Sequence, residues 1–396
     1  MFNHLRGLSL FANVGMAETY LNDLGIEIML ANEKEEVRGE FYKHLHPKTE
    51  MIIGDITEDD IRNTIINKAN ALDVNLIIAT PPCQGMSRHG KRELFDPRNQ
   101  LITYAIDVIK KVKPMFVLLE NVPKQLTTRI DYFGEEILIP EYIKRELEEI
   151  YHFNTDTIVN SADFGVPQRR ERSIFLLSRK DQGIVWEHPV PKKKKQITLR
   201  EAIGELPSLD PLVRDPDERW RFPNFEEKKE EGLKVSKWHY PPTHSWKHIQ
   251  WMMHTPSGKT AFENNIYYPK KDDGTTIKGR ISTYKRYSWD KPANTITQNN
   301  GVISSAICVH PGRLIQDDGS EEGRIYSDAR VLTIYELLIV SSLPTNWNIP
   351  TWATETTIRN AIGEGIPPLL IKEIFRALLS GPQPYRKREV QLVADI

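Results

Sequence analysis

Short apolar runs alternate with longer amphipathic stretches through the first half of the chain. The runs are short enough for buried strands, whereas residues 101–112 place their apolar side chains at helical spacing. Strands that alternate with helices predict an α/β fold, in which helices cover a mostly parallel sheet. We expect strands at residues 8–11, 26–31, 51–53, 76–79, 116–119 and 173–177, and further helices at residues 331–340 and 367–379.

Polar or stiff residues follow five of the predicted strands. Ligands of such sheets bind at the carboxyl ends of the strands. One or two polar residues there would be ordinary loop positions, but five in succession at one edge favour a binding edge. These residues are Asn13, Glu33, Asp55, Pro82-Cys83 and Glu120-Asn121.

The sequence changes character after about residue 185. Residues 192–195 are lysines, and residues 232–289 contain ten Lys or Arg against three Asp or Glu, a local charge of +7 in a chain that sums to −1. Tryptophans and tyrosines are interleaved with these cations, a combination suited to contacting phosphates and bases. The alternatives are that the aromatic residues form a small core and that the lysine run is a solvated linker. We expect a larger domain at residues 1–185, completed by helices at 340–396, and a smaller, mainly β and loop domain at residues 186–339.

Composition removes several classes of protein. Two cysteines, Cys83 and Cys308, are too few for a disulfide scaffold or a Cys-rich zinc site, and we expect no metal. Cys308 lies in an apolar run and is expected to be a buried structural residue. No apolar run reaches the ~20 residues of a membrane span, and the N-terminal sequence lacks a signal-peptide layout. We therefore expect a cytoplasmic protein without a membrane partner.

Three segments carry candidate chemistry. Cys83 follows a predicted strand and two prolines that stiffen the backbone at the mouth of the sheet, so its thiolate could act as a nucleophile. Glu120 ends an apolar strand, where partial burial favours a carboxyl that shares a proton near neutral pH. Arg170 and Arg172 lie on one side of an extended segment and could reach anions or carbonyl oxygens. The alternatives are a structural cysteine, an ion-paired glutamate and a solvated charge run.

In this order, the three segments resemble the signature motifs of the DNA cytosine-5 methyltransferases. The matching motifs are Pro-Pro-Cys-Gln-Gly at 81–85, Glu-Asn-Val at 120–122 and Gln-Arg-Arg-Glu-Arg at 168–172. Each motif alone is weak, but the joint match is specific. The resemblance extends to residues 11–15, 32–33, 54–56, 96–101, 330–336 and 362–368, and it covers about residues 5–185 and 285–380.

The resemblance implies a Rossmann-like, S-adenosylmethionine-dependent catalytic domain and a smaller target-recognition domain. It implies that Cys83 attacks carbon 6 of a flipped cytosine, that Glu120 bonds ring nitrogen 3, and that Arg172, with Arg170 near it, holds the oxygen at position 2. Carbon 5 then takes the methyl group. The expected cofactor-binding residues are Phe11, Gly15, Glu33, Asp55, Ile56, Pro82, Leu101, Glu364 and Gly365.

Duplex DNA is the partner that the resemblance implies. Residues 84–99 suit a loop that closes over the flipped base, because they are rich in Arg, His, Lys and Gly and adjoin Cys83; the alternative is a solvated surface loop. The residues expected to contact DNA are Gln84, Ser87, Arg88, Arg98, Gln168, Lys285 and Arg286. The implied setting is a prokaryotic restriction-modification system with a cognate restriction endonuclease, or a solitary enzyme. We expect a monomer associated with the nucleoid.

Three positions near the implied cofactor pocket depart from the family. Ser9 stands where the family usually has an acid, Asn13 where it has glycine, and Glu364 where it has asparagine. These departures leave a catalytically silent DNA-binding subunit open as an alternative. A tRNA cytosine-5 methyltransferase is a second alternative, although neither cysteine is followed by the Phe-Thr pair of those relatives.

Overall fold

A computed structural model describes residues 4–82, 97–154, 158–191, 195–271, 273–279, 281–381 and 383–384. The chain divides into two compact units. Unit 1 comprises Met1–Val159, Glu171–Val190 and Lys372–Ile396, and unit 2 comprises Asn160–Arg170 and Pro191–Ile371. The predicted boundaries assign residues 160–170 and 340–371 to the larger domain, whereas their contacts group them with unit 2.

Unit 1 is built on the predicted parallel sheet, which antiparallel strands extend on one side. The strand order is β3-β2-β1-β4-β5-β10-β8, and β9 pairs with β10. The first five run parallel, and β10 is antiparallel to both β5 and β8. The strands are β1 (Leu5–Leu10), β2 (Ile26–Glu33), β3 (Glu50–Ile53), β4 (Leu76–Ala79), β5 (Phe116–Asn121), β8 (Tyr151–Asn154), β9 (Ile158–Asn160) and β10 (Glu171–Arg179). The predicted α/β fold and its six strands are confirmed.

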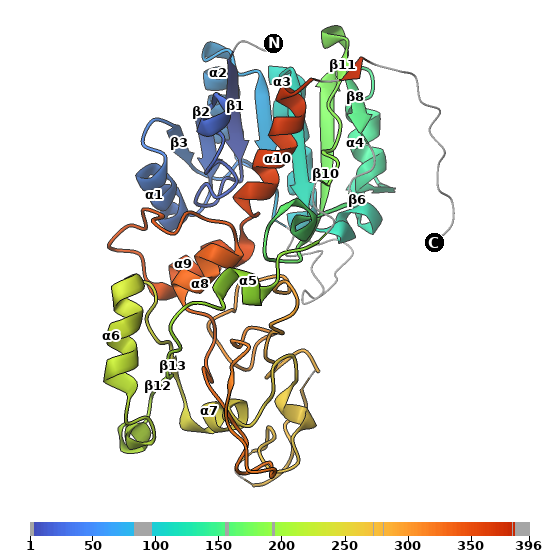
Figure 1. The fold of residues 1–396 in the computed structure, drawn as a ribbon. Helices are drawn as coiled ribbons and strands as arrows, with labels where there is room; N and C mark the ends of the chain where they lie inside the picture. Colours follow the sequence, from blue (N-terminus) through green and yellow to red (C-terminus); the bar gives the residue numbers. More distant parts are fainter. Residues whose placement is uncertain are drawn as a thin grey trace. The chain divides into compact units, whose positions relative to one another are not determined.

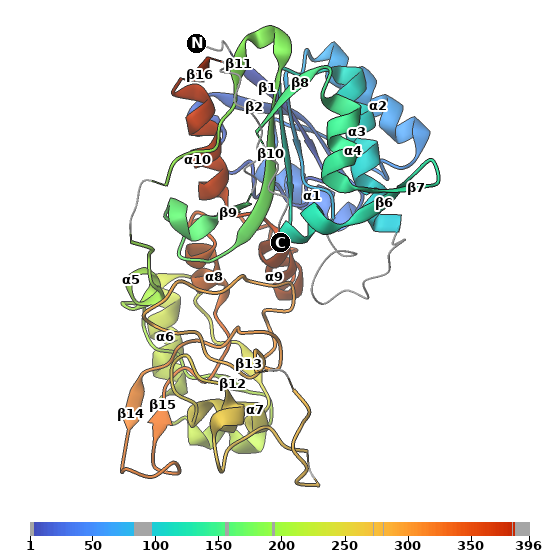
Figure 2. The same ribbon diagram turned by 90° about the vertical axis from the view of Figure 1, so that its right-hand side faces the viewer.

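Helices cover both faces of this sheet. Helices α2 (Asp59–Ala71), α3 (Leu101–Val112) and α4 (Ile139–Leu147) lie on one face, and α10 (Pro368–Leu379), whose residues from Lys372 onward belong to unit 1, lies on the other (Figure 1 and Figure 2). Helix α1 (Glu36–Leu45) packs along β2 and β3, and a hairpin of β6 (Arg129–Tyr132) and β7 (Glu135–Leu138) precedes α4. Helix α3 spans the predicted residues because its buried side chains recur at helical spacing.

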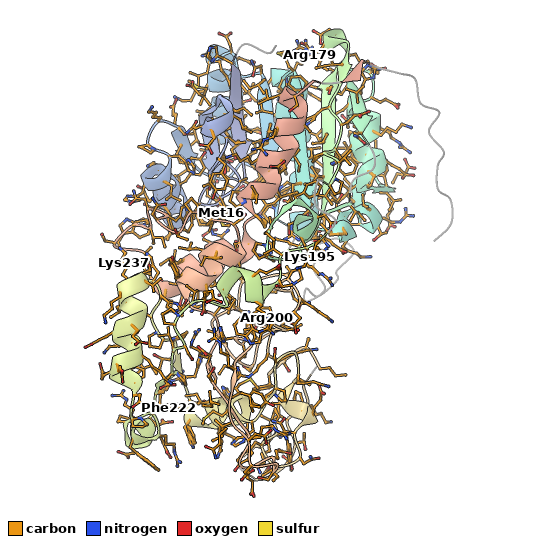
Figure 3. The ribbon with its side chains drawn as sticks, in the orientation of Figure 1. Met16, Arg179, Lys195, Arg200, Phe222 and Lys237 are labelled. Atoms are coloured by element: carbon orange, nitrogen blue, oxygen red, sulfur yellow. The ribbon has the colours of Figure 1, made fainter. Side chains whose placement is uncertain are left out.

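The carboxyl ends of the five parallel strands share one edge of the sheet with the amino end of β10. The register that pairs Ser173 with Asn121 places the start of β10 beside the end of β5. Figure 3 shows Met16, which follows β1, and Arg179, which ends β10, at opposite ends of the sheet. The edge that the sequence predicts for binding is therefore formed by the segments after β1 to β5 and by the first residues of β10.

Trp186 and α10 complete the core on one face of unit 1. The Trp186 side chain is fully buried, and its ring centroid lies 5.0 Å from that of Phe375 and 6.0 Å from that of Phe116. Its indole Nε1 donates to the carbonyl of Ile374 at 3.2 Å. Next to it, β11 (Ile184–Val185) pairs with β16 (Gln383–Pro384). Residues near the C-terminus thus cover a core that begins on β5.

Unit 2 consists of helices, long loops and strands of only two or three residues, so the helices are more prominent than predicted. Strand β12 (Leu212–Val213) pairs with β13 (Thr243–His244), and β14 (Leu314–Gln316) pairs with β15 (Ile325–Tyr326). Its helices are α5 (Leu199–Ile203), α6 (Phe225–Val235), α7 (Trp246–Met253), α8 (Ile334–Val340) and α9 (Glu355–Glu364).

Several aromatic residues of the basic stretch form the core of unit 2. Trp251 and Tyr284 are buried together with Cys308, Val309 and Val331. The alternative of a small aromatic core is therefore correct for part of this stretch. Cys308 is a buried structural residue as predicted, and burial raises the pKa of its thiol to about 12.

Candidate active site

Glu120 and Arg172 form a shielded ion pair at the carboxyl edge of the sheet. Glu120 is the penultimate residue of β5 and Arg172 is the second residue of β10. Arg172 Nε lies 2.7 Å from Glu120 Oε1, and the two side chains are 10% and 11% exposed. The pair fixes the orientation of the carboxyl and keeps a positive charge beside it. The structure thus brings together two of the predicted catalytic side chains.

Asn121 connects this pair to the segment that precedes Cys83. Its Nδ2 donates to the carbonyl of Pro81 at 3.1 Å, and its Oδ1 accepts from the backbone amide of Val122 at 2.8 Å. The end of β4 is therefore held next to the end of β5. Cys83, Gln84, Ser87 and Arg88 lie outside the described residues, as does the side chain of Arg98.

Glu33 presents a buried carboxylate at the end of β2. Glu33 is only 6% exposed. Oε2 accepts from the backbone amide of Asn13 at 2.8 Å, and Oε1 accepts from the amide of Glu35 at 2.9 Å. Each carboxylate oxygen has a second lone pair, so Glu33 can also accept from the hydroxyls of a ligand.

Asp55 and Ile56 follow β3, the neighbouring strand. Asp55 pairs with Lys34 at 2.8 Å and accepts from the backbone amide of Thr57 at 3.0 Å. Burial alone would raise the pKa of Asp55, but the hydrogen bonds from Lys34 and Thr57 lower it overall. Ile56 is buried, whereas Asp55 is half-buried. An ionised acceptor thus adjoins an apolar side chain.

The loop after β1 contains three residues in the left-handed region. The φ angle is 57° at Phe11, 50° at Asn13 and 79° at Gly15. Asn13 retains the left-handed conformation although it replaces the family's glycine, because asparagine tolerates that region better than most residues. A Cβ at Gly15 would lie 2.4 Å from His46 Nε2 and 2.8 Å from Tyr42, so this position requires glycine.

The groups at the ends of β1, β2 and β3 fit a nucleoside-containing cofactor. An acid after the second strand suits ribose hydroxyls. Strand β2, which ends at Glu33, lies between β1, which the loop follows, and β3, which Asp55 and Ile56 follow. Pro82 and Leu101, which begins α3, are half-buried in unit 1. Glu364 and Gly365 end α9 and belong to unit 2.

Ser9 and Glu18 form a buried pair that sequence reasoning missed. Ser9 is 2% exposed and Glu18 is 4% exposed, and Ser9 Oγ donates to Glu18 Oε1. Burial raises the pKa of the Glu18 carboxyl to about 7, partly offset by the hydrogen bond from Ser9. The signal that could have found the pair is the family's missing acid at position 9 together with a new acid directly after the loop.

Replacing Glu18 with glutamine is expected to change the pH dependence of stability. The folded chain holds a proton on Glu18 up to about pH 7, whereas an unfolded carboxyl releases it near 4.5. The contribution of Glu18 to wild-type stability is therefore present below pH 4.5 and is lost as the pH rises to about 7. Across that range, the free energy of unfolding of Glu18→Gln should increase relative to that of wild type by at most roughly 3 kcal/mol.

Urea unfolding at about pH 5 and pH 8 measures this difference. Glu27→Gln, which changes an exposed acid on β2, is the matched control and should show no such growth. Equal differences between Glu18→Gln and wild type at both pH values would contradict the assignment.

Arg170 occupies a different environment from Arg172. It is 2% exposed, and its guanidinium donates to the carbonyls of Ile296 at 2.8 Å, Gly363 at 3.0 Å and Glu364 at 2.9 Å. These bonds connect the Gln168–Arg172 motif to the end of α9 inside unit 2. Nη1 and Nη2 of Arg170 thus donate to backbone carbonyls, and the predicted role of Arg170 beside Arg172 at the substrate stays a prediction.

The structure leaves no room for a side chain at Gly363. A Cβ there would lie 2.3 Å from the carbonyl oxygen of Thr297 and 2.7 Å from the amide of Gln298. Gly363→Ala should therefore lower the free energy of unfolding by about 1–3 kcal/mol, as measured by urea titration. Thr356→Ala, at an exposed position of the same helix, is the control. A Gly363→Ala protein as stable as this control would disprove the close approach.

Two predicted DNA contacts are incompatible with burial. Arg286 is fully buried and donates to the carbonyls of Met252, His310, Ser327 and Asp328 at 2.7–3.2 Å. Gln168 is 1% exposed; its Nε2 donates to Ser341 Oγ at 3.4 Å, and its Oε1 accepts from the backbone amide of Ile296 at 3.2 Å. Both predictions are wrong, because these side chains bind their own unit. Lys285 is half-buried, and its DNA contact stays a prediction.

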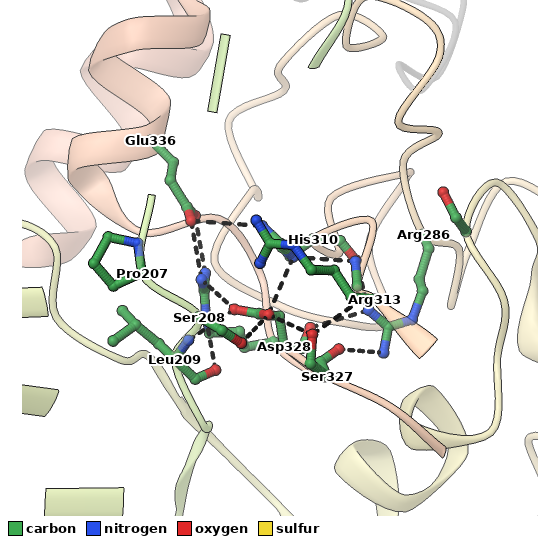
Figure 4. Close-up of polar contacts among 12 residues, drawn as sticks. Pro207, Ser208, Leu209, Arg286, His310, Arg313, Ser327, Asp328 and Glu336 are labelled. Carbon is green, nitrogen blue, oxygen red and sulfur yellow. Dashed lines mark hydrogen bonds and ion pairs between the residues drawn. The ribbon is translucent and has the colours of Figure 1, made fainter. Parts of the chain in front are cut away.

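A buried ionic network, the Arg330 network, consists of Asp328, Arg330 and Glu336 in unit 2. Arg330 donates to Asp328 Oδ1 at 2.7 Å and to both oxygens of Glu336 at 2.8 and 2.9 Å. Asp328 also accepts from Ser208 Oγ at 2.5 Å and from the amide of Leu209 at 2.9 Å (Figure 4). Burial would raise the pKa of Glu336, but Arg330 holds it at about 2. The network joins the segments around residues 208 and 330 to the first turn of α8.

Among the residues that the structure describes, no three His, Cys, Asp or Glu side chains are grouped as metal ligands would be. Within that described part of the chain, no helix has both the length and the apolar character that a membrane crossing needs.

Comparison with known proteins gives consistent matches. A family model described as C-5 cytosine-specific DNA methylase matches residues 5–380. The chain is 42% identical over 385 residues to the type II methyltransferase M1.HgaI of Avibacterium volantium, covering 96% of this chain and 99% of that protein. It is 26% identical over 377 residues to the type II methyltransferase M1.HphI of Haemophilus parahaemolyticus, covering 94% and 86%.

A solved structure shares the fold. A prophage protein from E. coli, described as a DNA modification methyltransferase, superposes with a TM-score of 0.66 at 19% identity, covering 95% of this chain and 99% of that one. This likeness confirms the predicted methyltransferase fold class. The family model spans both segments in which the sequence motifs were found. The chain belongs to the C-5 cytosine-specific DNA methylases.

Proposed function

We propose that this protein transfers a methyl group to carbon 5 of a flipped cytosine in a specific duplex DNA sequence, with Cys83 as the nucleophile. The observation that carries the proposal is the Glu120–Arg172 pair, with Arg172 Nε 2.7 Å from Glu120 Oε1, at the edge where Asn121 also holds Pro81. Cys83 is two residues beyond Pro81 in the sequence. A nucleophile, a proton-sharing carboxyl and a fixed positive charge are the groups that this reaction needs.

The proposed chemistry divides one difficult step into easier ones. The thiolate of Cys83 adds to carbon 6 of the ring, which makes carbon 5 electron-rich. Glu120, which is ion-paired with Arg172 before the base binds, takes up a proton from solvent and shares it with ring nitrogen 3 as the charge moves into the ring. Arg172 orients that carboxyl and stabilises negative charge that develops at the oxygen of position 2. After carbon 5 has gained the methyl group, it loses its proton to a water molecule. The electrons of that C–H bond then form the double bond between carbons 5 and 6, which expels the Cys83 thiolate and restores the aromatic ring.

The proposed cofactor is S-adenosylmethionine, which supplies the methyl group when bound. Glu33 accepts hydrogen bonds from the ribose hydroxyls, since its carboxylate is held by two backbone amides at the end of β2. Asp55 and Ile56 contact the adenine, and Phe11 and Gly15 line the loop. Pro82 and Leu101 belong to the proposed site in unit 1, and the cofactor contacts of Glu364 and Gly365 stay predictions.

The proposed partners are duplex DNA and a cognate restriction endonuclease. M1.HgaI and M1.HphI are both named type II methyltransferases, which supports a protein that marks host DNA in a restriction-modification system. The target base is flipped out of the duplex, because a stacked cytosine is inaccessible to a thiolate. We propose Gln84, Ser87, Arg88, Arg98 and Lys285 as DNA contacts, and a monomer in the bacterial cytoplasm.

Bisulfite sequencing of plasmid DNA from cells that express the protein tests this function. Wild type should protect cytosines within one recurring sequence, and Cys83→Ala should protect none while still binding DNA. Cys308→Ala is the matched control, since Cys308 is the other of the two cysteines and is buried in unit 2. Methylation that survives Cys83→Ala would contradict the nucleophile. Labelled methyl groups that enter tRNA but not duplex DNA would contradict the substrate.

A further inference from the structure

The Ser9–Glu18 pair spans the loop that carries the proposed cofactor contacts. Ser9 is the penultimate residue of β1, and Glu18 follows the loop of residues 11–15. Both residues are almost fully buried, and the Ser9 hydroxyl donates to Glu18 Oε1. The other carboxyl oxygen, Oε2, is buried and has no hydrogen-bond partner among the described residues. The pair therefore joins the end of β1 to the segment that follows the loop.

The loop itself needs external restraint. Two residues other than glycine, Phe11 and Asn13, have φ angles of 57° and 50°, and Gly15 follows at 79°. Side chains with a Cβ occupy the left-handed region at an energetic cost, which persists only where the surroundings fix the conformation. The loop's own backbone provides one restraint, the bond from the Gly15 amide to the Ala12 carbonyl at 2.9 Å.

Other restraints act on the middle of the loop. The amide of Asn13 donates to Glu33 at 2.8 Å, and the carbonyl of Gly15 lies 2.9 Å from His46 Nε2. The carbonyl of Phe11 accepts from Thr80 Oγ1 at 3.1 Å. These bonds join the loop to the end of β2, to Thr80 directly after β4 and to His46 directly after α1, whereas the Ser9–Glu18 pair joins the segments on either side of the loop.

We propose that Glu18 is a positioning residue for the cofactor loop, which it acts on through its hydrogen bond with Ser9. The inference rests on the proposed assignment of this loop to S-adenosylmethionine.

The surroundings of Glu18 explain why an uncharged acceptor should suffice there. The group that acts on it from α1 is Tyr42, a fully buried phenol whose pKa is raised by burial and by Glu18. His46, next to Gly15, has its pKa lowered by burial. No cation among the described residues pairs with Glu18, so its task is to accept a hydrogen bond. Glutamine can do this through its amide oxygen, whereas alanine cannot.

Calorimetric binding of S-adenosylhomocysteine, the demethylated product, tests the proposal without turnover. Ser9→Ala and Glu18→Ala should each weaken binding by about tenfold, and the double variant should be no weaker than the worse single variant, because the two residues act as one unit. Glu18→Gln should stay within about threefold of wild type. Glu27→Ala, at an exposed position of β2, is the control for loss of an acid, and circular dichroism verifies folding.

Three outcomes would overturn the inference. Binding by Glu18→Ala within about twofold of wild type would show that the loop does not depend on the pair. A Glu18→Gln protein as weak as Glu18→Ala would show that Glu18 acts by charge, as in a direct contact. Additive losses in the double variant would show that the residues act independently. If wild type itself does not bind S-adenosylhomocysteine, the cofactor assignment under the proposed function fails as well. That result differs from one in which wild type binds and the variants bind equally well, which contradicts only the role of Glu18.

Discussion

Replacing Glu120 with glutamine is expected to slow methyl transfer by roughly 10²–10⁴-fold, the contribution typical of a positioned proton donor. Glutamine has nearly the same shape and can still accept from Arg172 Nε, which lies 2.7 Å from Glu120 Oε1 in the wild type. It cannot give a proton to ring nitrogen 3, so attack by the thiolate would leave charge in the ring without compensation. Single-turnover transfer of a labelled methyl group to duplex DNA measures the effect.

The control for this experiment is Glu146→Gln. Glu146 also belongs to an ion pair of unit 1, with Lys110 at 2.6 Å, but it lies on α4. This variant loses an ion pair away from the carboxyl edge and should keep the wild-type rate. A Glu120→Gln enzyme within about tenfold of the wild-type rate would remove Glu120 from the mechanism. Gel-shift binding of DNA separates a lost reaction step from lost affinity.

Replacing Arg330 with alanine is expected to destabilise the protein by about 3–5 kcal/mol. Arg330 is fully buried and binds Asp328 and Glu336, which are also buried. Its removal leaves two carboxylates without their cation in a site that excludes water. Glu336 additionally caps α8, since its Oε2 accepts from the amide of Thr333 at 2.8 Å and its own amide donates to Thr333 Oγ1 at 3.1 Å.

Arg324→Ala provides the comparison for Arg330→Ala. Arg324 pairs with Asp317 at 3.2 Å on the surface, where its side chain is 40% exposed, and loss of such a solvent-screened pair should cost far less stability than loss of Arg330. Urea unfolding followed by circular dichroism gives both values. Similar costs for the two variants would show that the Arg330 network does not stabilise unit 2.

Regular elements of unit 1 were predictable because their signals are local. The apolar spacing of residues 101–112 predicts α3 with its observed ends, and short apolar runs predict β4 and β5. In unit 2, the helix predicted at residues 331–340 begins only at Ile334, after a capping box at Thr333 whose Thr-x-x-Glu pattern is a local signal of that start. The edge that holds Glu120 and Asn121 follows from parallel topology, since carboxyl ends of parallel strands meet.

The partners of individual cations were not predictable from local sequence. Arg170 and Arg172 share one side of an extended segment, yet one binds the carbonyls of Ile296 and Gly363 and the other binds Glu120. These partners are far apart along the chain, and alternation along a strand does not identify them. The same holds for Arg286. A cation among aromatic residues can lie on the surface or donate to buried carbonyls, and only the tertiary structure determines which of the two environments it occupies.

The packing of α10 on Trp186 has a consequence for synthesis on the ribosome. Trp186 leaves the ribosome well before Phe375 and the carbonyl of Ile374, its partners in the finished core. Residues 191–371 are translated between them, which takes roughly 10–40 s at ~5–20 residues per second. During that interval the indole and the sheet face beneath it have no α10 to cover them. Synthesis of unit 1 therefore begins before that of unit 2 and ends after it. A chain released before α10 is made retains an uncovered apolar face that promotes aggregation.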